Sequence, residues 1–532
     1  MFDYIIIGGG SAGCVLANRF SENPAHAVCL LEAGPSDQTY WIRSCNPLNM
    51  LYLMNSRKYN WRYNTEPEAA TGNRPFFWPR GKTLGGSSSI NAMIYSRGHR
   101  WDFDHWANLG NTGWDYDSVL PWFKKSERQQ RGADDFHGVD GTMDVVDTNF
   151  HFPASEAFVE ACQQAGFVYN HDLNGSSQDG CDFFQVNQTP EGKRCHASAS
   201  FLDPVKHRPN LTVITHAQVS KIVIRDKTAT GVEYIDLKKQ KRRVTLSAKK
   251  EILLSAGVTN SPQVLKLSGI GSGDELRKLE IPVIHDLPGV GENLQDHPDI
   301  LLRIQDKSKT SFCTTPGPYT LNFLSRYFSR TQPFIYTPTE AGGFVKSGPS
   351  EPIPDLQLQF AAVRMQPHGK GLFTTAKFGF VLHVCHMRPK SRGRITLRSA
   401  NPFDPPRIEA NYFQNETELN ALVKGVKIAR GILSQPALQA YHGGEEVPGI
   451  SVKSDSEIRT FIKQKMETVY HTAGSCKMGN DPLAVVDPEL KVHGIKNLRV
   501  IDSSIMPTIT GSNIHGPTVM IAEKGAHMVL NR

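Results

Sequence analysis

Residues 1–34 constrain the fold of this chain more than any other stretch. A run of β-forming residues at 4–7 leads into a glycine-rich turn, and a helix-compatible run at 14–20 and a second apolar run at 28–31 follow. The glycines of the turn are Gly8, Gly10 and Gly13. A strand, a glycine turn, a helix and a second strand in this order are typical of a unit that binds a dinucleotide.

Each glycine of this turn is needed for a different physical reason. Gly8 lets the chain leave the strand in a tight turn, Gly10 presents no Cβ to a pyrophosphate, and Gly13 allows close packing of helix on strand. The free N–H groups at the start of the helix face the phosphates. Glu32 follows about twenty residues past Gly13, where a carboxylate accepts the ribose hydroxyls. The sequence therefore predicts a dinucleotide site at the start of the chain.

Composition narrows the class of protein. A length of 532 residues predicts two to four domains, and 39% hydrophobic with 21% charged residues is typical of a globular enzyme. No uncharged apolar run approaches the ~18 residues that span a bilayer, and no basic region of a signal peptide precedes the first strand. We therefore expect a cytoplasmic protein. The nine cysteines are scattered without C-x-x-C spacing, which indicates reduced thiols and argues against a disulfide framework or a zinc site.

The positive net charge does not predict a nucleic-acid partner. It is +7 over the whole chain, and its densest run is 238–243, between strand-like runs at 231–237 and 244–248. Such a run is expected at the solvated tip of a hairpin. A nucleic-acid surface would need interleaved aromatic residues or a recognisable binding fold.

Later stretches extend the dinucleotide unit. A second glycine-rich element, 80–93, is expected where backbone passes close to a flat or charged group, although an ordinary glycine loop explains it equally well. Residues 251–255 have the pattern of a buried strand. A strand that returns so late in the sequence implies that the dinucleotide domain is discontinuous. A helix is expected to follow, with Ser261 as its N-cap and Pro262 at its first position.

The middle of the chain has a different character. Alternating apolar residues at 355–363 and 378–384 predict a sheet with one covered face. Prolines and aromatic residues gather in 311–338, which we interpret as a lid or the rim of a pocket.

Two histidines near the C-terminus are candidate catalytic groups. His471 and His515 each lie beside a turn of glycine and other small residues. A histidine takes and returns a proton near neutral pH, because its reference pKa is about 6.5. One such histidine would usually be structural, but two in a chain with a dinucleotide site favour catalysis. No spacing of histidines and acids indicates a metal.

These motifs resemble those of the glucose–methanol–choline (GMC) flavin oxidoreductases over essentially the whole chain. Residues 81–91 are similar to the first signature of the family, and 261–271 to most of the second, with Val258 where a smaller residue is usual. The stretch PGVGENLQDHP at 288–298 and the two histidines also fit. The ending IMPTITGSN at 505–513 most resembles bacterial choline-dehydrogenase-like and aliphatic-alcohol dehydrogenases.

The resemblance implies a fold and a division into domains. The expected class is α/β (α+β overall), with a discontinuous Rossmann-type FAD-binding domain and a substrate-binding domain built on an antiparallel sheet. The FAD-binding domain would comprise 1–155, 211–300 and 466–532, and the substrate-binding domain 156–210 and 301–465, with a lid near 311–338.

The resemblance also implies FAD as the cofactor and a set of residues that bind it. Those expected around the ADP half are Gly8, Gly10, Ser11, Ala12, Gly13, Glu32 and Ala33, with Val219 reaching the adenine through its backbone. Those expected along the pyrophosphate and the isoalloxazine are Leu84, Gly85, Gly86, Asn91, Ala92, Met93 and Ile94. Asp502, Ser503 and Pro517, at the start of a C-terminal helix, would meet the ribityl chain and the N1–C2=O edge, where a helix N-terminus stabilises the anionic reduced flavin.

Some relatives attach FAD covalently through a histidine in the first signature. Ile90 stands at that position and cannot form the bond, so the resemblance implies non-covalent FAD.

The implied reaction is the oxidation of a primary alcohol to the aldehyde. His471 would take the hydroxyl proton while hydride passes to flavin N5, and His515 would hydrogen-bond the same oxygen. Alternatives on the same scaffold are an alcohol oxidase that uses O2, a non-redox lyase, a photodecarboxylase and a flavin-binding protein without catalysis. Glu340 could pair with a quaternary ammonium substrate, although similar acids occur in relatives that act on uncharged alcohols.

The electron acceptor is expected to be a quinone or O2. A quinone acceptor implies peripheral contact with the inner face of the cytoplasmic membrane. The candidate surface is 319–336, where aromatic and aliphatic residues alternate with Arg326 and Arg330. The same residues could instead line the mouth of the pocket.

Overall fold

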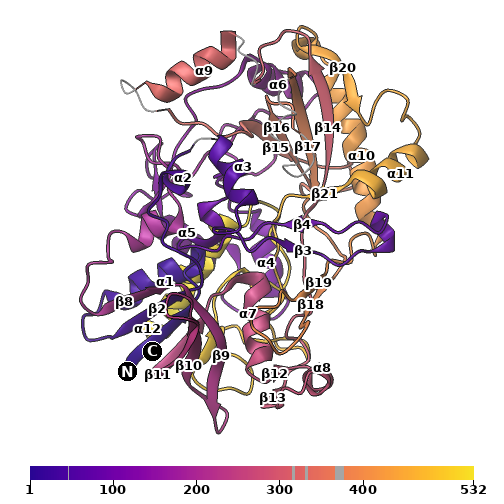
Figure 1. Ribbon diagram of the computed structural model, residues 1–532. Helices are drawn as coiled ribbons and strands as arrows, with labels where there is room; N and C mark the ends of the chain where they lie inside the picture. The colour runs from indigo at the N-terminus through magenta and orange to yellow at the C-terminus, as the bar shows by residue number, and fades with distance from the viewer. Residues whose placement is uncertain (46, 314–317, 330–333, 366–376, 532) are drawn as a thin grey trace.

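The computed structural model describes residues 1–45, 47–313, 318–329, 334–365 and 377–531. The chain forms two halves, each built on one large sheet (Figure 1). In the view of Figure 1 both chain ends are drawn at the outer end of the first half.

The sheet of the first half has seven strands in the order β8-β2-β1-β11-β10-β9, with β22 also on β11. β8, β2, β1, β11 and β22 pair in parallel, and β9 and β10 complete an antiparallel meander. The long β11 pairs in both ways: its first half is antiparallel to β10, and its last residues are parallel to β1 and β22. The strands are β1 (Phe2–Ile7), β2 (Val28–Glu32), β8 (Leu211–Thr215), β9 (Ala217–Arg225), β10 (Thr228–Asp236), β11 (Arg242–Leu254) and β22 (Leu498–Val500).

Helices cover this sheet. α1 (Ser11–Ser21) packs on α12 (His515–Leu530), which packs in turn on α5 (Tyr116–Ser126). Arg19 of α1 donates two hydrogen bonds to the buried Glu523 of α12, from Nε at 2.8 Å and from Nη2 at 2.7 Å. A bidentate ion pair therefore holds the first and last helices of the chain together, and its planar geometry fixes their relative orientation.

The sheet of the second half is antiparallel, in the order β15-β16-β17-β14-β20, with β21 also on β14. Alternate residues of β14 face opposite sides. Ile300, Leu302 and Ile304 lie in the apolar core with α6 and α10, whereas Asp299 and Leu301 face a cavity. The elements are β14 (Pro298–Asp306), β15 (Ala341–Val345), β16 (Leu356–Ala361), β17 (Gly379–His386), β20 (His442–Val447), β21 (Glu467–Thr468), α6 (Pro153–Gln164), α10 (Glu416–Leu433) and α11 (Asp455–Lys465).

Shorter elements connect and flank the two sheets. They are α2 (Tyr40–Arg43), α3 (Pro47–Asn55), β3 (Tyr63–Asn64), β4 (Phe77–Trp78), α4 (Arg100–Asn108), β5 (Glu127–Gln129), β6 (Met143–Val145), β7 (Gly180–Phe183), α7 (Gly257–Leu267), β12 (Ile270–Gly271), α8 (Gly273–Lys278), β13 (His285–Asp286), α9 (Pro318–Phe328), β18 (Arg394–Thr396) and β19 (Arg407–Glu409).

The predicted fold class is confirmed. The Rossmann-type sheet takes its strands from the beginning, the middle and the end of the chain, so it is discontinuous as expected. β21 and the first residues of β14 lie within the segments assigned to the FAD-binding domain, yet they pair in the second sheet. The domain limits themselves stay a prediction.

The helix expected to begin at Ser261 begins earlier, at Gly257, so that prediction is wrong. The N–H of Gly257, the first of the helix, is capped by a residue far away in the sequence, because it donates to Asp502 Oδ2 at 2.9 Å. Pro262 therefore lies inside the helix, where it has no N–H for the carbonyl of Val258. Ser475 Oγ supplies the missing donor, at 2.5 Å from that carbonyl.

Three further expectations concern the basic run, the cysteines and membrane-spanning helices. The basic run 238–243 is exposed at the β10–β11 turn, as predicted. All nine cysteines lie in the described part of the chain, where they are buried and form no disulfide bond. Among the described residues, no helix is both long enough and apolar enough to cross a bilayer.

Candidate active site

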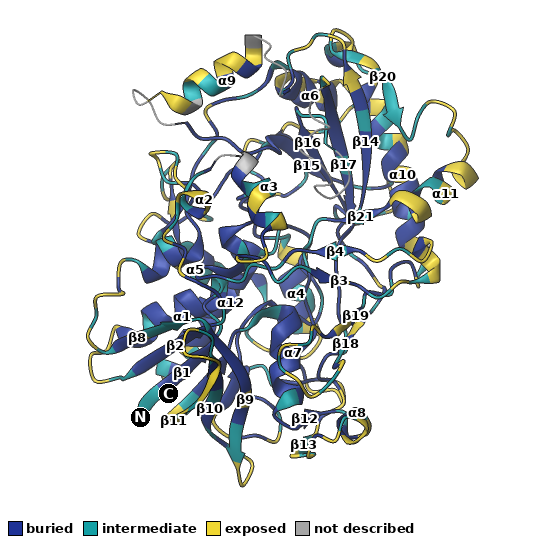
Figure 2. Cartoon of the chain, in the orientation of Figure 1, coloured by how far each residue is buried: buried dark blue, intermediate teal, exposed yellow. Residues whose placement is uncertain are grey.

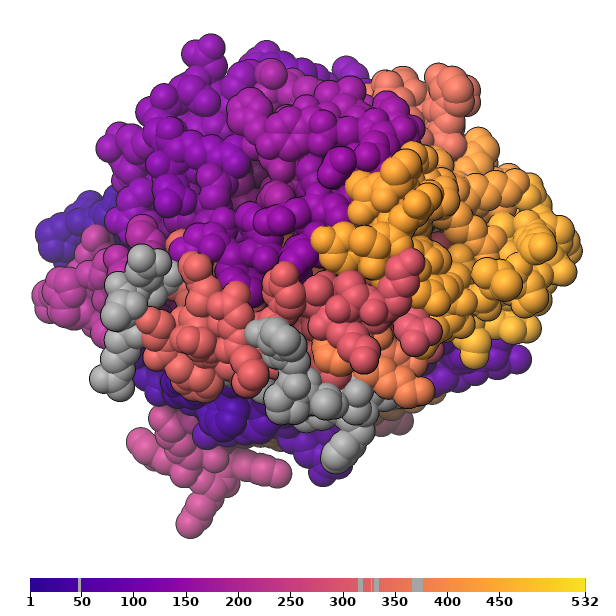
Figure 3. All heavy atoms as spheres, turned by 90° about the horizontal axis from the view of Figure 1, so that it is seen from above, coloured from indigo at the N-terminus to yellow at the C-terminus, as the bar shows by residue number. Residues whose placement is uncertain are grey.

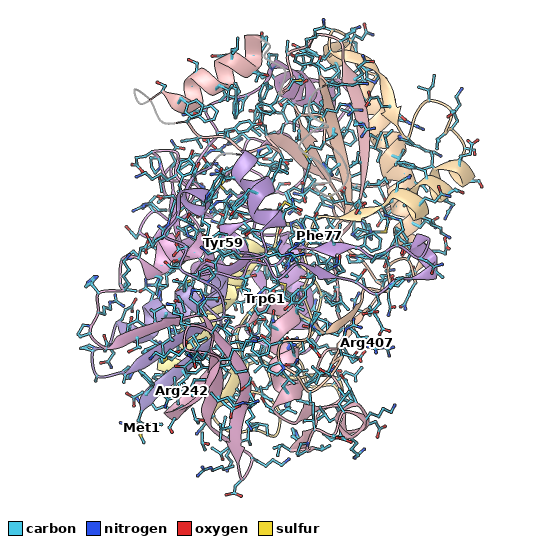
Figure 4. The ribbon with its side chains drawn as sticks, viewed as in Figure 1. Met1, Tyr59, Trp61, Phe77, Arg242 and Arg407 are labelled. Carbon is cyan, nitrogen blue, oxygen red and sulfur yellow. The ribbon has the colours of Figure 1, made fainter. Side chains whose placement is uncertain are left out.

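A cavity of about 850 Å³ lies between the two sheets. Its wall combines the glycine turn after β1, the starts of α1, α7 and α12, and the cavity-facing residues of β14, β16 and β17. Trp61, which also lines it, lies midway between the two halves (Figure 4). The cavity is therefore bounded by both sheets.

Most of the predicted site residues come together in this wall. Those that line the cavity are Gly8, Gly10, Ser11, Ala12, Glu32, Ala33, Gly86, Asn91, Ala92, Met93, Ile94, Val219, His471, Asp502, Ser503 and His515. Gly13, Leu84, Gly85 and Pro517 are not among its lining residues.

The four residues outside the wall lie close behind it. A Cβ on Gly13 would lie 1.8 Å from the carbonyl oxygen of Gly8, so Gly13 serves close packing of helix on strand. Gly85 donates its N–H to the carbonyl of Gly9 at 2.8 Å, which holds the second glycine-rich element against the first. Pro517 is buried in the first turn of α12.

The shape of the wall fits a dinucleotide. α1 and α12 both begin at the cavity, and neither has a side-chain cap at its N-terminus in the described part of the chain. Their first N–H groups and helix dipoles are thus available to an anionic ligand. A Cβ on Gly10 would come no nearer than 3.9 Å to any other group, so a side chain there would grow into the cavity.

Glu32 is positioned where the ribose of such a ligand is expected. Its carboxylate accepts N–H hydrogen bonds from Gly9 at 2.9 Å and Gly34 at 2.7 Å, which fix its orientation at the end of β2. Burial raises the pKa of Glu32 to about 7, against the lowering effect of these two bonds. A carboxyl group so enclosed is suited to hydroxyl partners, which satisfy it without adding charge.

His471 is held by partners on both ring nitrogens. Its Nδ1 lies 3.1 Å from Nδ1 of His297, and its Nε2 lies 3.0 Å from the amide nitrogen of Asn513. Burial, followed by the positive charge of Arg80, lowers the pKa of His471 to about 3. The ring is therefore neutral at physiological pH.

His515 has the opposite arrangement. It is buried at the start of α12, and neither ring nitrogen has a hydrogen-bond partner among the described residues. Burial lowers the pKa of His515 to about 4. Buried polar atoms without partners are costly, so these nitrogens are placed to receive the polar atoms of a ligand.

Sequence reasoning missed three residues of this site. Asn513 and His297 contact His471, and Gln357 donates to the Asn513 side chain at 3.1 Å. Asn513 and His297 fall in the motifs at 505–513 and 288–298, so position in a motif was the available signal. Gln357 lies on β16, and only the fold brings it to the cluster.

Glu340 does not fill the role considered for it. The side chain is fully buried, accepts the N–H of Phe152 at 2.9 Å and is not part of the cavity wall, which its neighbour Thr339 lines. Burial raises the pKa of Glu340 well above its usual range. The idea that Glu340 pairs with a quaternary ammonium group in the cavity is therefore wrong.

Comparisons with known proteins agree with this geometry. Family models for GMC oxidoreductases match residues 2–299 and 389–522. An alcohol dehydrogenase [acceptor] of Pseudomonas putida is 44% identical over 100% of this chain and 96% of its own length. An oxygen-dependent choline dehydrogenase of Burkholderia multivorans is 41% identical over 100% of this chain and 94% of its own. Pyridoxine 4-oxidase from Mesorbium loti has a similar structure, with a TM-score of 0.89 at 29% identity and full coverage of both chains.

The fold and the cavity define a flavoprotein oxidoreductase. The chain belongs to the GMC oxidoreductase family, and with it to the FAD-dependent enzymes that oxidise alcohols.

The substitution Gly10→Ala tests the cofactor site. It should weaken FAD binding by about tenfold or more, because the new methyl group occupies space needed by the pyrophosphate. The melting temperature of FAD-free protein should not change, because that methyl group would lie at ordinary contact distance, 3.9 Å, from the Cα of Gly86. Titration of FAD-free protein by quenching of flavin fluorescence measures the affinity. Gly431→Ala in α10, which also faces open space, is the control. Wild-type affinity in Gly10→Ala would place the pyrophosphate elsewhere.

Proposed function

We propose that the protein oxidises a primary alcohol to the aldehyde, with His471 as the proton acceptor and His515 as the group that stabilises the developing alkoxide. The observation that carries the proposal is a pair of neutral histidines, His515 buried and His471 half-buried, in the wall of a cavity shaped for a dinucleotide. FAD, when bound, supplies the acceptor for the hydride.

The histidines have different tasks because their surroundings differ. Nδ1 of His471 is engaged by His297, so Nε2 is the nitrogen that can take the hydroxyl proton, once the alcohol replaces the Asn513 amide as its partner. The unpartnered nitrogens of His515 can donate to the alcohol oxygen from the N-terminus of α12, where the helix dipole adds positive potential.

Removing each histidine in turn tests these roles. His471→Ala should abolish reduction of bound FAD by a primary alkanol, because the proton acceptor is lost while the contacts to FAD remain. His515→Ala should lose less, on the order of 10²-fold, as expected for one stabilising donor. Anaerobic stopped-flow measurement of flavin reduction gives both rates. The opposite ranking would exchange the two roles, and unchanged rates in both variants would favour a non-redox lyase or a photodecarboxylase.

We also propose that FAD is bound without a covalent link. The position that carries the linking histidine in some relatives is occupied by Ile90, which lines the cavity and packs with Ile42, Leu53 and Tyr59.

Acid precipitation tests this point. All yellow colour should pass into the supernatant, because isoleucine offers no atom that bonds to the flavin. Colour that stays with the pellet after repeated washing would show a covalent link through another residue. His515→Ala, precipitated in parallel, would show whether that histidine is the residue concerned.

The electron acceptor we propose is a quinone, with O2 as the alternative, and contact with the cytoplasmic membrane would be peripheral. The structure narrows the surface for this contact, because Phe323, Phe334, Ile335 and Tyr336 of the predicted segment are buried. Arg326 lies over the ring of Phe150, 5.9 Å from its centre, and Arg330 lies outside the described residues.

The outer face of α9 supports membrane contact. Leu321 and Phe328 are 55% and 68% exposed, and Phe323 on the inner face anchors the helix in a cluster of aromatic rings. Figure 2 shows the exposed residues along α9, and Figure 3 shows this helix, in coral, at the surface of the end viewed from above. Exposed leucine and phenylalanine on one helix face are suited to the headgroup region of a bilayer.

Co-sedimentation with vesicles of anionic phospholipid tests this contact. Wild-type protein should sediment with the vesicles, and the double variant Leu321→Glu/Phe328→Glu should remain in solution, because two carboxylates oppose insertion into an anionic surface. Leu483→Glu, at an exposed leucine distant in sequence, is the control. The membrane proposal fails if wild-type protein does not sediment, or if the double variant binds equally well.

A further inference from the structure

We propose that the side-chain amides of Asn513, Gln357 and Gln359 form a directional relay that positions His471 as a base, by keeping its Nε2 unprotonated until the alcohol hydroxyl replaces the Asn513 N–H at that nitrogen. The inference rests on the proposed function of His471 and adds Gln357 and Gln359, which lie outside the family motifs. We call these three residues the amide relay.

The relay is a continuous chain of hydrogen bonds. Gln359 Nε2 donates to Gln357 Oε1 at 3.0 Å, and Gln357 Nε2 donates to Asn513 Oδ1 at 3.1 Å. The Asn513 amide nitrogen then lies 3.0 Å from Nε2 of His471. Gln357 and Asn513 thus each accept at the oxygen, and the donors of all three amides point toward His471.

This direction determines which ring nitrogen of His471 carries the proton. An amide N–H can only donate, so Nε2 of His471 must accept and holds no proton. The proton of the neutral ring is then on Nδ1, which donates to Nδ1 of His297 at 3.1 Å. The hydrogen bond made by one ring nitrogen of a histidine commonly determines which of the two nitrogens carries the proton. The tautomer selected is the one whose lone pair is on Nε2, where it accepts from Asn513, a residue of the cavity wall.

The sheet holds the relay rigidly. Gln357 and Gln359 are two residues apart on β16, so their side chains lie on the same face. They pair across the sheet with Cys385 and His383 of β17, on the face that lines the cavity. Gln357 is fully buried and Gln359 nearly so. Two buried glutamines whose amides bond to each other and to a third amide specify one arrangement.

The relay acts among charged groups that also influence His471. Arg80 lowers the pKa of His471, and Asp299, itself bonded to His383 at 2.6 Å, raises it. Burial, followed by the neighbouring His471, His386 and Arg388, lowers the pKa of His297 well below its usual range. Glu467 and Tyr470 lie on the same segment as His471 and also line the cavity. Because the relay is uncharged, it selects the tautomer without adding charge to this group.

The substitution Gln357→Glu tests the direction of the relay. A carboxylate accepts at both oxygens, so it should draw the Asn513 nitrogen toward itself and turn the Asn513 oxygen toward His471. His471 should then carry its proton on Nε2. Gln357→Met, which has a similar length and no amide, removes the relay without reversing it and is the matched control. Asn513→Asp gives the same reversal one step nearer to His471 if Gln357→Glu does not fold.

Two measurements on FAD-loaded protein decide the outcome. The ring 15N chemical shifts of His471, assigned with a His471→Gln variant, should show a proton on Nδ1 in the wild type and on Nε2 in Gln357→Glu. The rate of flavin reduction at neutral pH should fall about tenfold or more in Gln357→Glu, and less in Gln357→Met. The acid limb of its pH profile should also move upward in Gln357→Glu, because the carboxylate and the reversed amide both stabilise protonated His471.

Failure of the relay and failure of the proposed function give different results. A proton on Nε2 of His471 in the wild type, or an unchanged tautomer in both Gln357→Glu and Asn513→Asp, overturns the relay while His471 remains essential. Undiminished flavin reduction in His471→Ala overturns the proposed function itself, whatever the tautomer.

Discussion

The contact between two glycine-rich turns supports the rest of the site. Gly85 donates its N–H to the carbonyl of Gly9, and a Cβ on Gly86 would lie 2.7 Å from the Cα of Gly10. Backbone approaches backbone this closely only where neither chain carries a side chain. The second glycine-rich element is therefore no ordinary loop. It closes over the first turn and brings residues 91–94 to the wall of the cavity.

The two halves contribute different properties to one cavity. The parallel sheet and its helices offer unpaired N–H groups and the positive ends of helix dipoles, which suit phosphates and an anionic flavin. In the antiparallel sheet, side chains on one face line the cavity, and apolar side chains on the other face pack in the core. Chemistry is therefore expected at the boundary, where His471 and His515 lie.

Burial determines the electrostatics of that boundary. Both histidines are neutral because a charged imidazole would lose its hydration there, and nearby arginines add to the effect. A neutral ring can act as a base only through the nitrogen that carries no proton. The hydrogen bonds of His471 to His297 and Asn513 are consequently as important as its position.

The sequence alone determined the local features and, through the resemblance, the family. Gly8 and Gly13 were predictable because their roles depend on backbone geometry within a few residues, and His471 and His515 because they lie in recognisable motifs. Only the tertiary structure decided the rest. α7 begins at Gly257, ahead of the expected cap, because its cap comes from Asp502, far along the chain. The partners of His471 and the burial of Glu340 likewise arise from packing between distant segments, which no local pattern encodes.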